Sequence, residues 1–207
     1  GVMSLQGVIL MGGQSSRMGQ DKSQLAVSSS ILQYNNLSAA TQHAKEPRTL
    51  AELAHSKLKY CVDNVHFSIN KNQAKLGLAN TILDEYEGEG PLSGIISSLK
   101  ATKSPIVVLG VDMPLVTIQS INNLIQQRNW DLLTTTFYHT QSNTWEPMLS
   151  IWEYETLPCL ENYFDNGGRS IQKFLNQFGN QRVPIPNSEE FTNINTLEEY
   201  SNLRLLS

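Results

Sequence analysis

Segment 11–22, MGGQSSRMGQDK, combines adjacent glycines with fixed positive charge directly after an apolar run. Gly12 and Gly13 can adopt positive φ and let backbone N–H groups approach an anion without a Cβ in the way. Arg17 and Lys22 would hold phosphate oxygens, Arg through a two-pronged fork and Lys as a point charge. The spacing is neither that of a Walker loop nor GxGxxG. These residues favour phosphate binding over a solvated strand-to-helix turn.

Two further stretches carry residues that suit a nucleotide. VLGVDMP ends an apolar run with Asp112, whose carboxylate would suit Mg²⁺ bridging nucleotide phosphates. A single Asp at a strand end is also common as a helix cap, so Asp112 alone decides nothing. LDEYEGEGPLSG places Asp84 after a strand, with Gly88, Gly90 and Gly94 around a helix start. Glycines there would let the backbone lie flat against a nucleoside.

Alternating strands and helices must position these loops. Strands are expected at residues 8–10, 65–69, 81–83, 106–111 and 132–137. Apolar stripes at helical spacing begin at Leu92, Ile118 and Ile171, and Thr49–Glu52 and Thr196–Glu199 have capping-box spacing. This alternation predicts an α/β fold of three layers, a Rossmann-like, mostly parallel sheet with helices on both faces. The loops would then meet at the carboxyl ends of the strands.

The chain of 207 residues suits one domain, 1–207, with a nucleotide-binding N-terminal half and an acceptor-binding C-terminal half. Segment 28–47 is polar and shows no clean period, so we interpret it as an insertion. The net charge of −4 argues against nucleic acid as a partner, and no apolar run suggests a membrane. Cys61 and Cys159 lack zinc or CxxC spacing. We expect a cytoplasmic protein.

Taken together, these stretches resemble the nucleotidyltransferases with a Rossmann-like fold, and most closely the molybdenum cofactor guanylyltransferases. The family's opening loop, like LAGGxSxRMGxDK, reads LMGGQSSRMGQDK here, and its GPLxGI element reads GPLSGI. Its CDMP-like element reads VDMP, and a pattern like FxNxNTPEEL reads FTNINTLEEY. The first loop is shared by many nucleotide transferases, whereas the ordered set is more specific. The resemblance spans nearly the whole chain except 28–47.

The resemblance implies transfer of GMP from GTP to the terminal phosphate of molybdopterin carrying molybdenum, with Mg²⁺ and release of pyrophosphate. It implies a nucleotide site of Leu10, Met11, Gly12, Gly13, Lys22, Asn70, Asp84, Gly90 and Asp112. Within it, Lys22 would contact the phosphates and Asp112 would hold the metal. We assign Arg17 to the leaving pyrophosphate because of its place in the loop. Arg17, Lys22 and Asp112 would then be the catalytic residues.

On the acceptor side, Asn193 and Asn195 match the family's asparagines linked to the pterin. They stand two positions apart, so their amides share one side of an extended segment. Glu146 of WEPMLSIW would accept a hydrogen bond, and Arg169 of NGGRSIQKFL would meet the pterin phosphate or be a solvated residue at a helix start. The resemblance also implies molybdopterin or molybdenum-molybdopterin as acceptor, and transient contact with other proteins of molybdenum cofactor biosynthesis.

The chemistry needs no side-chain base, because the attacking phosphate oxygen is already anionic near neutral pH. Positive charge and backbone N–H groups must stabilise the departing pyrophosphate instead. Met11, Val111 and Leu197 replace the family's frequent alanine, cysteine and proline. Two alternatives stay open: a transferase that uses CTP or another phosphorylated acceptor, and a nucleotide-binding regulator without catalysis.

Overall fold

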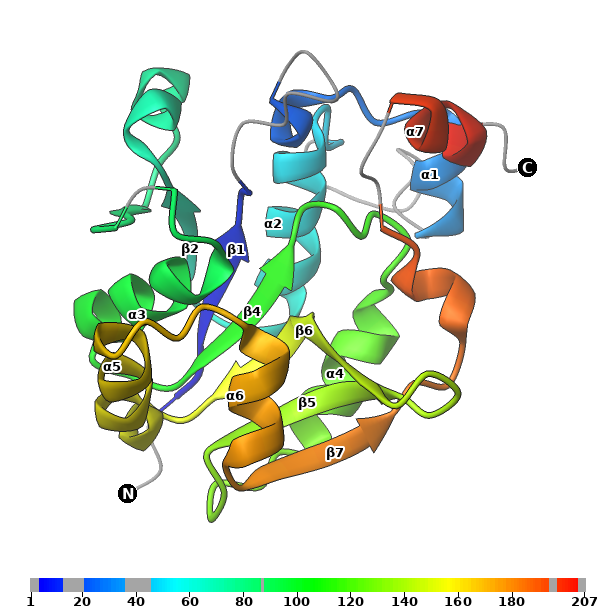
Figure 1. Ribbon diagram of the computed structural model, residues 1–207. Helices are drawn as coiled ribbons and strands as arrows, with labels where there is room; N and C mark the ends of the chain where they lie inside the picture. Colours follow the sequence, from blue (N-terminus) through cyan, green and yellow to red (C-terminus); the bar gives the residue numbers. More distant parts are fainter. Residues whose placement is uncertain (1–3, 13–20, 36–45, 87, 194–196, 205–207) are drawn as a thin grey trace.

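A seven-stranded sheet forms the middle layer of the computed structural model, which describes residues 4–12, 21–35, 46–86, 88–193 and 197–204 (Figure 1). The strand order is β3-β2-β1-β4-β6-β5-β7. The bounds are Gln6–Leu10 (β1), Val65–Ile69 (β2), Thr81–Leu83 (β3), Ile106–Gly110 (β4), Thr134–His139 (β5), Thr144–Trp152 (β6) and Asn180–Pro184 (β7). Only β6 runs against its neighbours among these strands. The expected mostly parallel sheet is confirmed.

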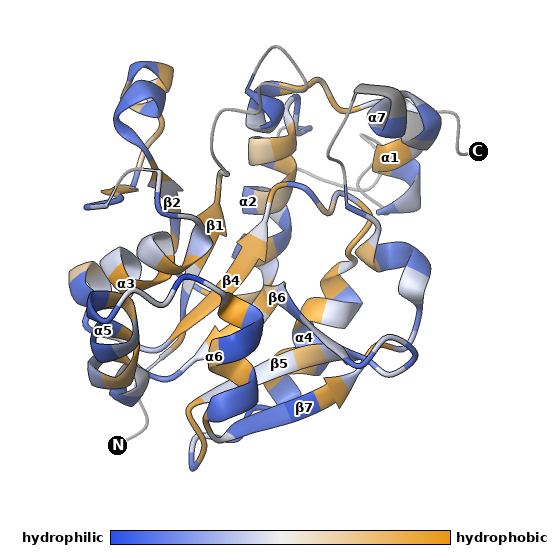
Figure 2. Ribbon diagram, viewed as in Figure 1, coloured by the Kyte–Doolittle hydropathy of each residue, from blue (hydrophilic) through white to orange (hydrophobic). Residues whose placement is uncertain are grey.

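Helices cover both faces of the sheet, because successive residues of β4 point to opposite sides and both sides are apolar. Val107 and Leu109 pack in one cluster with α2 (Leu50–Cys61) and α4 (Ile118–Gln126). Ile106 and Val108 pack on the other face with three helices. These are α3 (Pro91–Thr102), α5 (Leu157–Asp165) and α6 (Ile171–Gln177). In Figure 2 the apolar colour gathers along the strands and the inward sides of the helices.

Thr49 caps α2 at the predicted position, but the reciprocal bond of a capping box goes to Arg48 and not to Thr49. The hydroxyl of Thr49 accepts from the backbone N of Glu52 at 3.2 Å, and Glu52 accepts from the backbone N of Arg48 at 2.6 Å. The second predicted box begins at Thr196, which lies outside the described residues.

A third apolar cluster joins α1 (Ser29–Tyr34), η1 (Lys22–Gln24), the start of α2 and α7 (Leu197–Arg204). Ser28 caps α1, whose Ile31 and Leu32 are buried. The segment interpreted as an insertion therefore supplies a packed helix over its first residues. Two apolar side chains in one short helix are too few to display a helical period.

Several elements were not predicted: α1, α5, β6 and β7, together with the short helices η3 (Lys71–Leu76), η4 (Tyr154–Thr156) and η5 (Ser188–Phe191). β5 begins two residues later than expected. None of the described helices is both long and apolar enough to traverse a membrane.

Candidate active site

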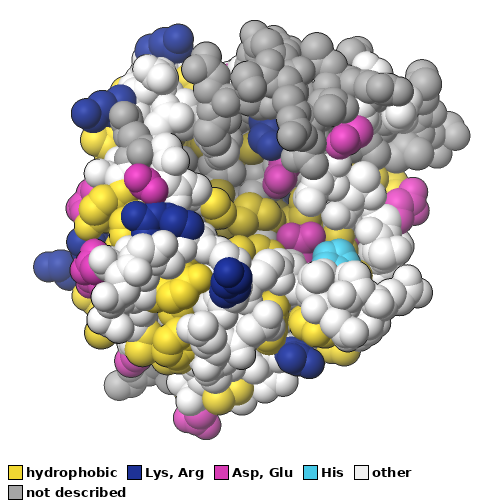
Figure 3. Space-filling view, in the orientation of Figure 1, with side chains coloured by type: hydrophobic (Ala, Val, Ile, Leu, Met, Phe, Trp, Pro, Cys, Tyr) yellow, Lys and Arg dark blue, Asp and Glu magenta, His cyan; other side chains and the backbone are white. Residues whose placement is uncertain are grey.

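A pocket of about 320 Å³ lies at the carboxyl ends of β1, β2 and β4. The chain leaves β1 toward β2 and β3 and later returns to β4 on the other side of β1, so this is the switch point where α/β sheets bind ligands. Figure 3 shows this face hollowed at its centre, with a hydrophobic floor and acidic side chains beside it. The lining residues are Leu10, Met11, Gly12, Lys22, Ser68, Ile69, Asn70, Gln73, Asp84, Gly88, Gly90, Pro91, Gly94, Val111, Asp112 and Met148.

Gly12 and Lys22 meet at one wall of this pocket. Gly12 has a φ of +74°, in the left-handed region that glycine adopts without strain. A Cβ at this position would lie 3.4 Å from Cε of Lys22, so the lysine side chain packs against the glycine backbone. Lys22 therefore places a cation at the exit of β1.

Asp112 follows β4 directly, and Gly110 allows its approach. A Cβ on Gly110 would lie 2.7 Å from Oδ1 of Asp112 and 3.0 Å from Sδ of Met148, both too close. Oδ1 is buried without a hydrogen-bond partner among the described residues. Burial raises the pKa of Asp112, and the charge of Lys22 opposes that rise. This carboxylate is therefore held in a desolvated place beside a cation.

The opposite wall carries the residues predicted to meet the nucleoside. Asp84 follows β3 and accepts from the backbone N of Tyr86 at 2.9 Å and from Oγ of Ser93 at 2.7 Å. Gly90 caps α3 with φ +83° and ψ −174°, a conformation that is essentially restricted to glycine. Asn70 ends β2 and caps η3 through its side-chain oxygen, which accepts from the backbone N of Gln73 at 3.0 Å.

Eight residues predicted for the nucleotide site line this one pocket: Leu10, Met11, Gly12, Lys22, Asn70, Asp84, Gly90 and Asp112. Gly13, Arg17 and Asn195 lie outside the described residues. The sequence interpretation missed Ser68, Gln73 and Met148 as lining residues. The spacing of Asn70 and Gln73, three positions apart after an apolar strand, was a signal for the second of these.

Glu146 lies outside the pocket lining, but its carboxyl group interacts electrostatically with that of Asp112, which does line the pocket. It belongs to β6, is buried, and pairs through Oε1 with Nε2 of His139 at 3.2 Å. Burial raises the pKa of Glu146, whereas the hydrogen bond and charge of His139 lower it. The charge of Asp112 adds to the rise. The two buried carboxylates thus repel one another at this side of the site.

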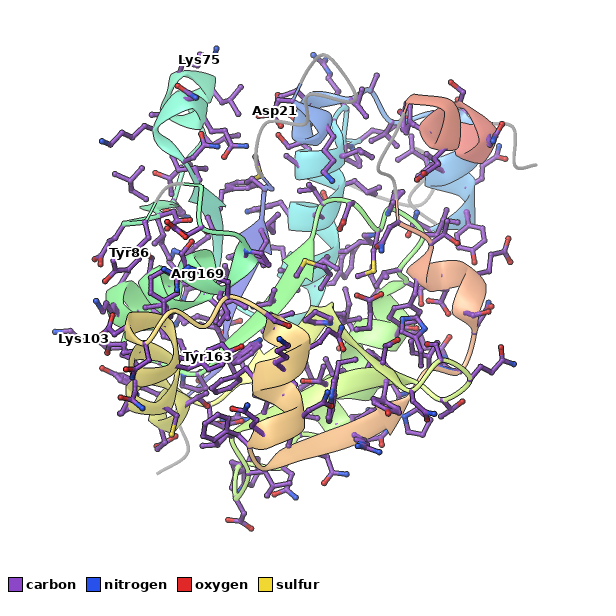
Figure 4. The ribbon with its side chains drawn as sticks, in the orientation of Figure 1. Asp21, Lys75, Tyr86, Lys103, Tyr163 and Arg169 are labelled. Atoms are coloured by element: carbon purple, nitrogen blue, oxygen red, sulfur yellow. The ribbon has the colours of Figure 1, made fainter. Side chains whose placement is uncertain are left out.

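Arg169 and Asn193 also lie outside the pocket lining. Arg169 precedes α6 and donates through Nε to Oε2 of Glu89 at 2.8 Å and through Nη1 to the carbonyl of Phe164 at 2.8 Å. Its guanidinium lies 3.7 Å from the centre of the Phe164 ring, and Figure 4 shows it between α3 and the turn that leads to α6. Asn193 is exposed, directly after η5.

The comparison with known families agrees with this geometry. The family model described as a MobA-like NTP transferase domain matches residues 7–182, which include β1, β4 and every pocket-lining residue. The chain belongs to this family.

Three proteins are similar to this chain along nearly its whole length. The molybdenum cofactor guanylyltransferase of Serratia proteamaculans is 25% identical over 202 residues, which are 94% of this chain and 91% of the relative. The crystal structure of molybdopterin-guanine dinucleotide biosynthesis protein A from Archaeoglobus fulgidus superposes with a TM-score of 0.72 at 19% identity, covering 97% of each chain. A Mycobacterium tuberculosis protein crystallised with manganese superposes with a TM-score of 0.58 at 11% identity, over 97% of this chain and 98% of that one.

Proposed function

We propose that this nucleotidyltransferase transfers GMP from GTP to the terminal phosphate of molybdenum-bearing molybdopterin and releases pyrophosphate. The observation that carries the proposal is that Asp112 and Lys22 line one pocket at the switch point of the sheet, where the charge of the lysine acts on the carboxyl group. The name of the Serratia proteamaculans relative supports guanylyl transfer for a chain of this length. The acceptor chemistry rests on that relationship and on the sequence resemblance.

The donor set of the pocket suits a divalent cation shared with nucleotide phosphates. Asp112 offers a buried carboxylate oxygen that lacks a hydrogen-bond partner in the described chain. No three His, Cys, Asp or Glu side chains gather as a complete metal cage in the part of the chain that the structure describes. Mg²⁺ prefers one or two carboxylates plus phosphate oxygens and water, so Asp112 is a sufficient protein ligand. When bound there, the cation stabilises charge that develops on the phosphates.

The remaining groups orient the substrates. Lys22 neutralises the triphosphate at the exit of β1, and the glycines at Gly12 and Gly90 let the nucleotide approach the backbone. Asp84 holds the turn before α3 through Tyr86 and Ser93, so that this wall is preformed. The attacking phosphate oxygen carries its own negative charge, so the enzyme supplies position and positive charge rather than a base.

A nucleotide panel tests this proposal. The purified chain is incubated with Mg²⁺, molybdenum-bearing molybdopterin and GTP, CTP, ATP or UTP in turn, and pyrophosphate release is measured. GTP should give the highest kcat/KM, and omission of the acceptor should abolish release. A preference for CTP, or turnover only with a different phosphorylated acceptor, would reassign the substrates. Binding of GTP without turnover under any condition would identify a regulator rather than a transferase.

A further inference from the structure

Gln73 of η3 is buried beside the pocket although its side chain ends in a polar amide. Its Oε1 accepts from the backbone N of Asn70 at 3.0 Å. Its Nε2 donates to the carbonyl of Gly12 at 3.2 Å and to Oδ2 of Asp21 at 3.0 Å. A side-chain amide has two N–H donors, and these two bonds use both. Both N–H donors of the Gln73 amide are therefore used within the protein, and neither is available to a ligand.

The two acceptors of Gln73 are the residues that determine where Lys22 lies. Asp21 directly precedes Lys22, and its other oxygen accepts from the backbone N of Ser23 at 3.0 Å, which fixes the start of η1. Gly12 packs against the lysine side chain. One amide thus joins the exit of β1, the start of η1 and the end of β2. Figure 4 labels Asp21 at the start of η1.

The contact with Gly12 also determines the direction of a peptide group in the pocket wall. Gly12 has a positive φ, and glycine can adopt several other conformations at similar energy. A hydrogen bond to its carbonyl selects one of them. Because the Gln73 side chain is buried, loss of this acceptor would leave one of its N–H donors without a partner.

We infer that Gln73 is a positioning residue for the nucleotide: it holds Gly12 and Asp21 so that Lys22 and the β1 exit are preformed for a triphosphate. This inference rests on the proposed function only in that the ligand is a nucleoside triphosphate. The base and the acceptor do not enter it. The entropy of ordering Gly12, Asp21 and Lys22 is then lost on folding and not on binding, which favours affinity.

The substitution Gln73→Glu tests the inference with nearly constant shape. It keeps the oxygen that accepts from Asn70, but it places an oxygen opposite the Gly12 carbonyl and the Asp21 carboxylate. Calorimetric titration of the full chain with GTP and Mg²⁺ should show at least a tenfold weaker Kd, or ~1.4 kcal/mol. The KM for the acceptor should stay unchanged. A residue that only stabilised the fold would lower the unfolding temperature without changing the Kd of the folded protein.

A second substitution provides the rescue. Asp21→Asn alone places two amides face to face and should also weaken GTP binding. Combined with Gln73→Glu it restores an amide-to-carboxylate bond in the reverse direction, but the Gly12 carbonyl still lacks a donor, so the double variant should recover only part of the affinity that Gln73→Glu loses. If Gln73→Glu does not fold, the Kd values for GTP of Asp21→Asn and of the double variant are compared instead.

Gln172→Glu is the matched control, because Gln172 makes a similar pair of amide bonds to the backbone of Trp145, at 2.9 and 2.8 Å. It should leave the Kd unchanged. A normal Kd in Gln73→Glu, or a double variant that binds GTP no better than Gln73→Glu does, overturns the inference. A wild type that binds another triphosphate better than GTP contradicts the proposed function instead. The same variants are then compared with that triphosphate.

Discussion

Lys57 of α2 donates a hydrogen bond to the carbonyl of Val116 across 2.7 Å, although it is only 1% exposed. The same Nζ contacts the carbonyl of Pro114 at 3.1 Å and Oδ1 of Asn35 at 3.4 Å. These three oxygens match the three N–H donors of an ammonium group. The amide of Asn35 also donates to Pro114 at 2.9 Å. A buried lysine and a residue of the segment after α1 therefore hold the chain that follows Asp112.

The stability of the protein should depend on pH through Lys57. Burial lowers its pKa from 10.5 to about 7, against a smaller opposing effect of the Glu190 charge. Between these two pH values the unfolded chain binds a proton that the folded chain has lost, so this group makes the free energy of unfolding rise with pH. Relative to Lys57→Met, wild type should gain stability between pH 7 and 9, by up to ~1.4 kcal/mol per unit. Urea unfolding at several pH values measures this.

Lys59→Met is the control for that experiment, because Lys59 is exposed on the same helix. Burial also raises the pKa of Cys61 to about 11, but this thiol is present in every variant and cancels from the differences. A pH-independent difference for Lys57→Met would show that the lysine titrates as it does in the unfolded chain.

Asp112→Asn should separate activity from stability. We expect turnover to fall by at least about 10²-fold, since the variant loses the negative charge that holds the metal. Because burial raises the pKa of Asp112, this group's contribution to stability is fully present below its unfolded pKa and is lost as pH rises through its folded pKa. The variant should therefore be at least as stable as wild type at pH 7. Asp131→Asn, at an exposed position, should change neither quantity.

Pyrophosphate release and thermal unfolding of both variants provide the measurements. Near-normal turnover in Asp112→Asn would move the metal to another ligand. A loss of turnover that parallels a loss of folded protein would mean that Asp112 supports the fold and not the reaction.

The sequence predicts those residues of the candidate site whose type and position near the end of a strand can be recognised without the structure. Asp84 and Asp112 are charged residues within two positions of the end of an apolar strand, Lys22 belongs to the glycine-rich segment after β1, and parallel strands bring their carboxyl ends to one edge. Gln73 acts through contacts with residues distant in the chain, which no local pattern reveals. Its effect on Asp21 depends on how β2 and η1 pack.

The missed strand β6 has a more specific physical reason. Pro147 lies in its interior, and proline cannot donate a ladder hydrogen bond, so a proline within an apolar run argues against a strand. The register between β5 and β6 shifts at Thr136 and Phe137, beside this proline. That irregularity accommodates Pro147, and the side chain of Met148 lies close to Gly110, as Asp112 does. A tertiary feature thus overrides the local preference.

The pair of Arg128 and Glu153 should be important for stability. The guanidinium donates to both carboxylate oxygens, at 2.6 and 2.9 Å, and both side chains are buried. Glu153→Gln leaves a buried guanidinium without its counter-charge, at a cost of ~3–5 kcal/mol. At ~2–4 °C per kcal/mol for a chain of this size, Tm should fall by roughly 6–20 °C. Calorimetry measures the shift, with exposed Glu155→Gln as control, and a fall below ~2 °C would contradict it.

Arg169 should contribute more to acceptor binding than to stability. Its pair with Glu89 is partly exposed on both sides and is worth only ~0.2–1 kcal/mol. Its bonds to the carbonyls of Phe164 and Gly168 use Nη1, so the other terminal nitrogen can meet a phosphate. We expect Arg169→Gln to raise the acceptor KM by about tenfold, the loss of one charge-assisted hydrogen bond, with little change in the KM for GTP.

Two further variants decide what Arg169 does. Lys173→Gln removes an exposed charge from α6 and should leave both KM values unchanged. Glu89→Gln removes the competing carboxylate and should lower the acceptor KM, because the guanidinium then keeps its full charge for the phosphate. If Arg169→Gln and Glu89→Gln instead raise the KM for GTP together, the pair acts as a clamp on the turn before α3. In that case the predicted contact with the acceptor phosphate is wrong.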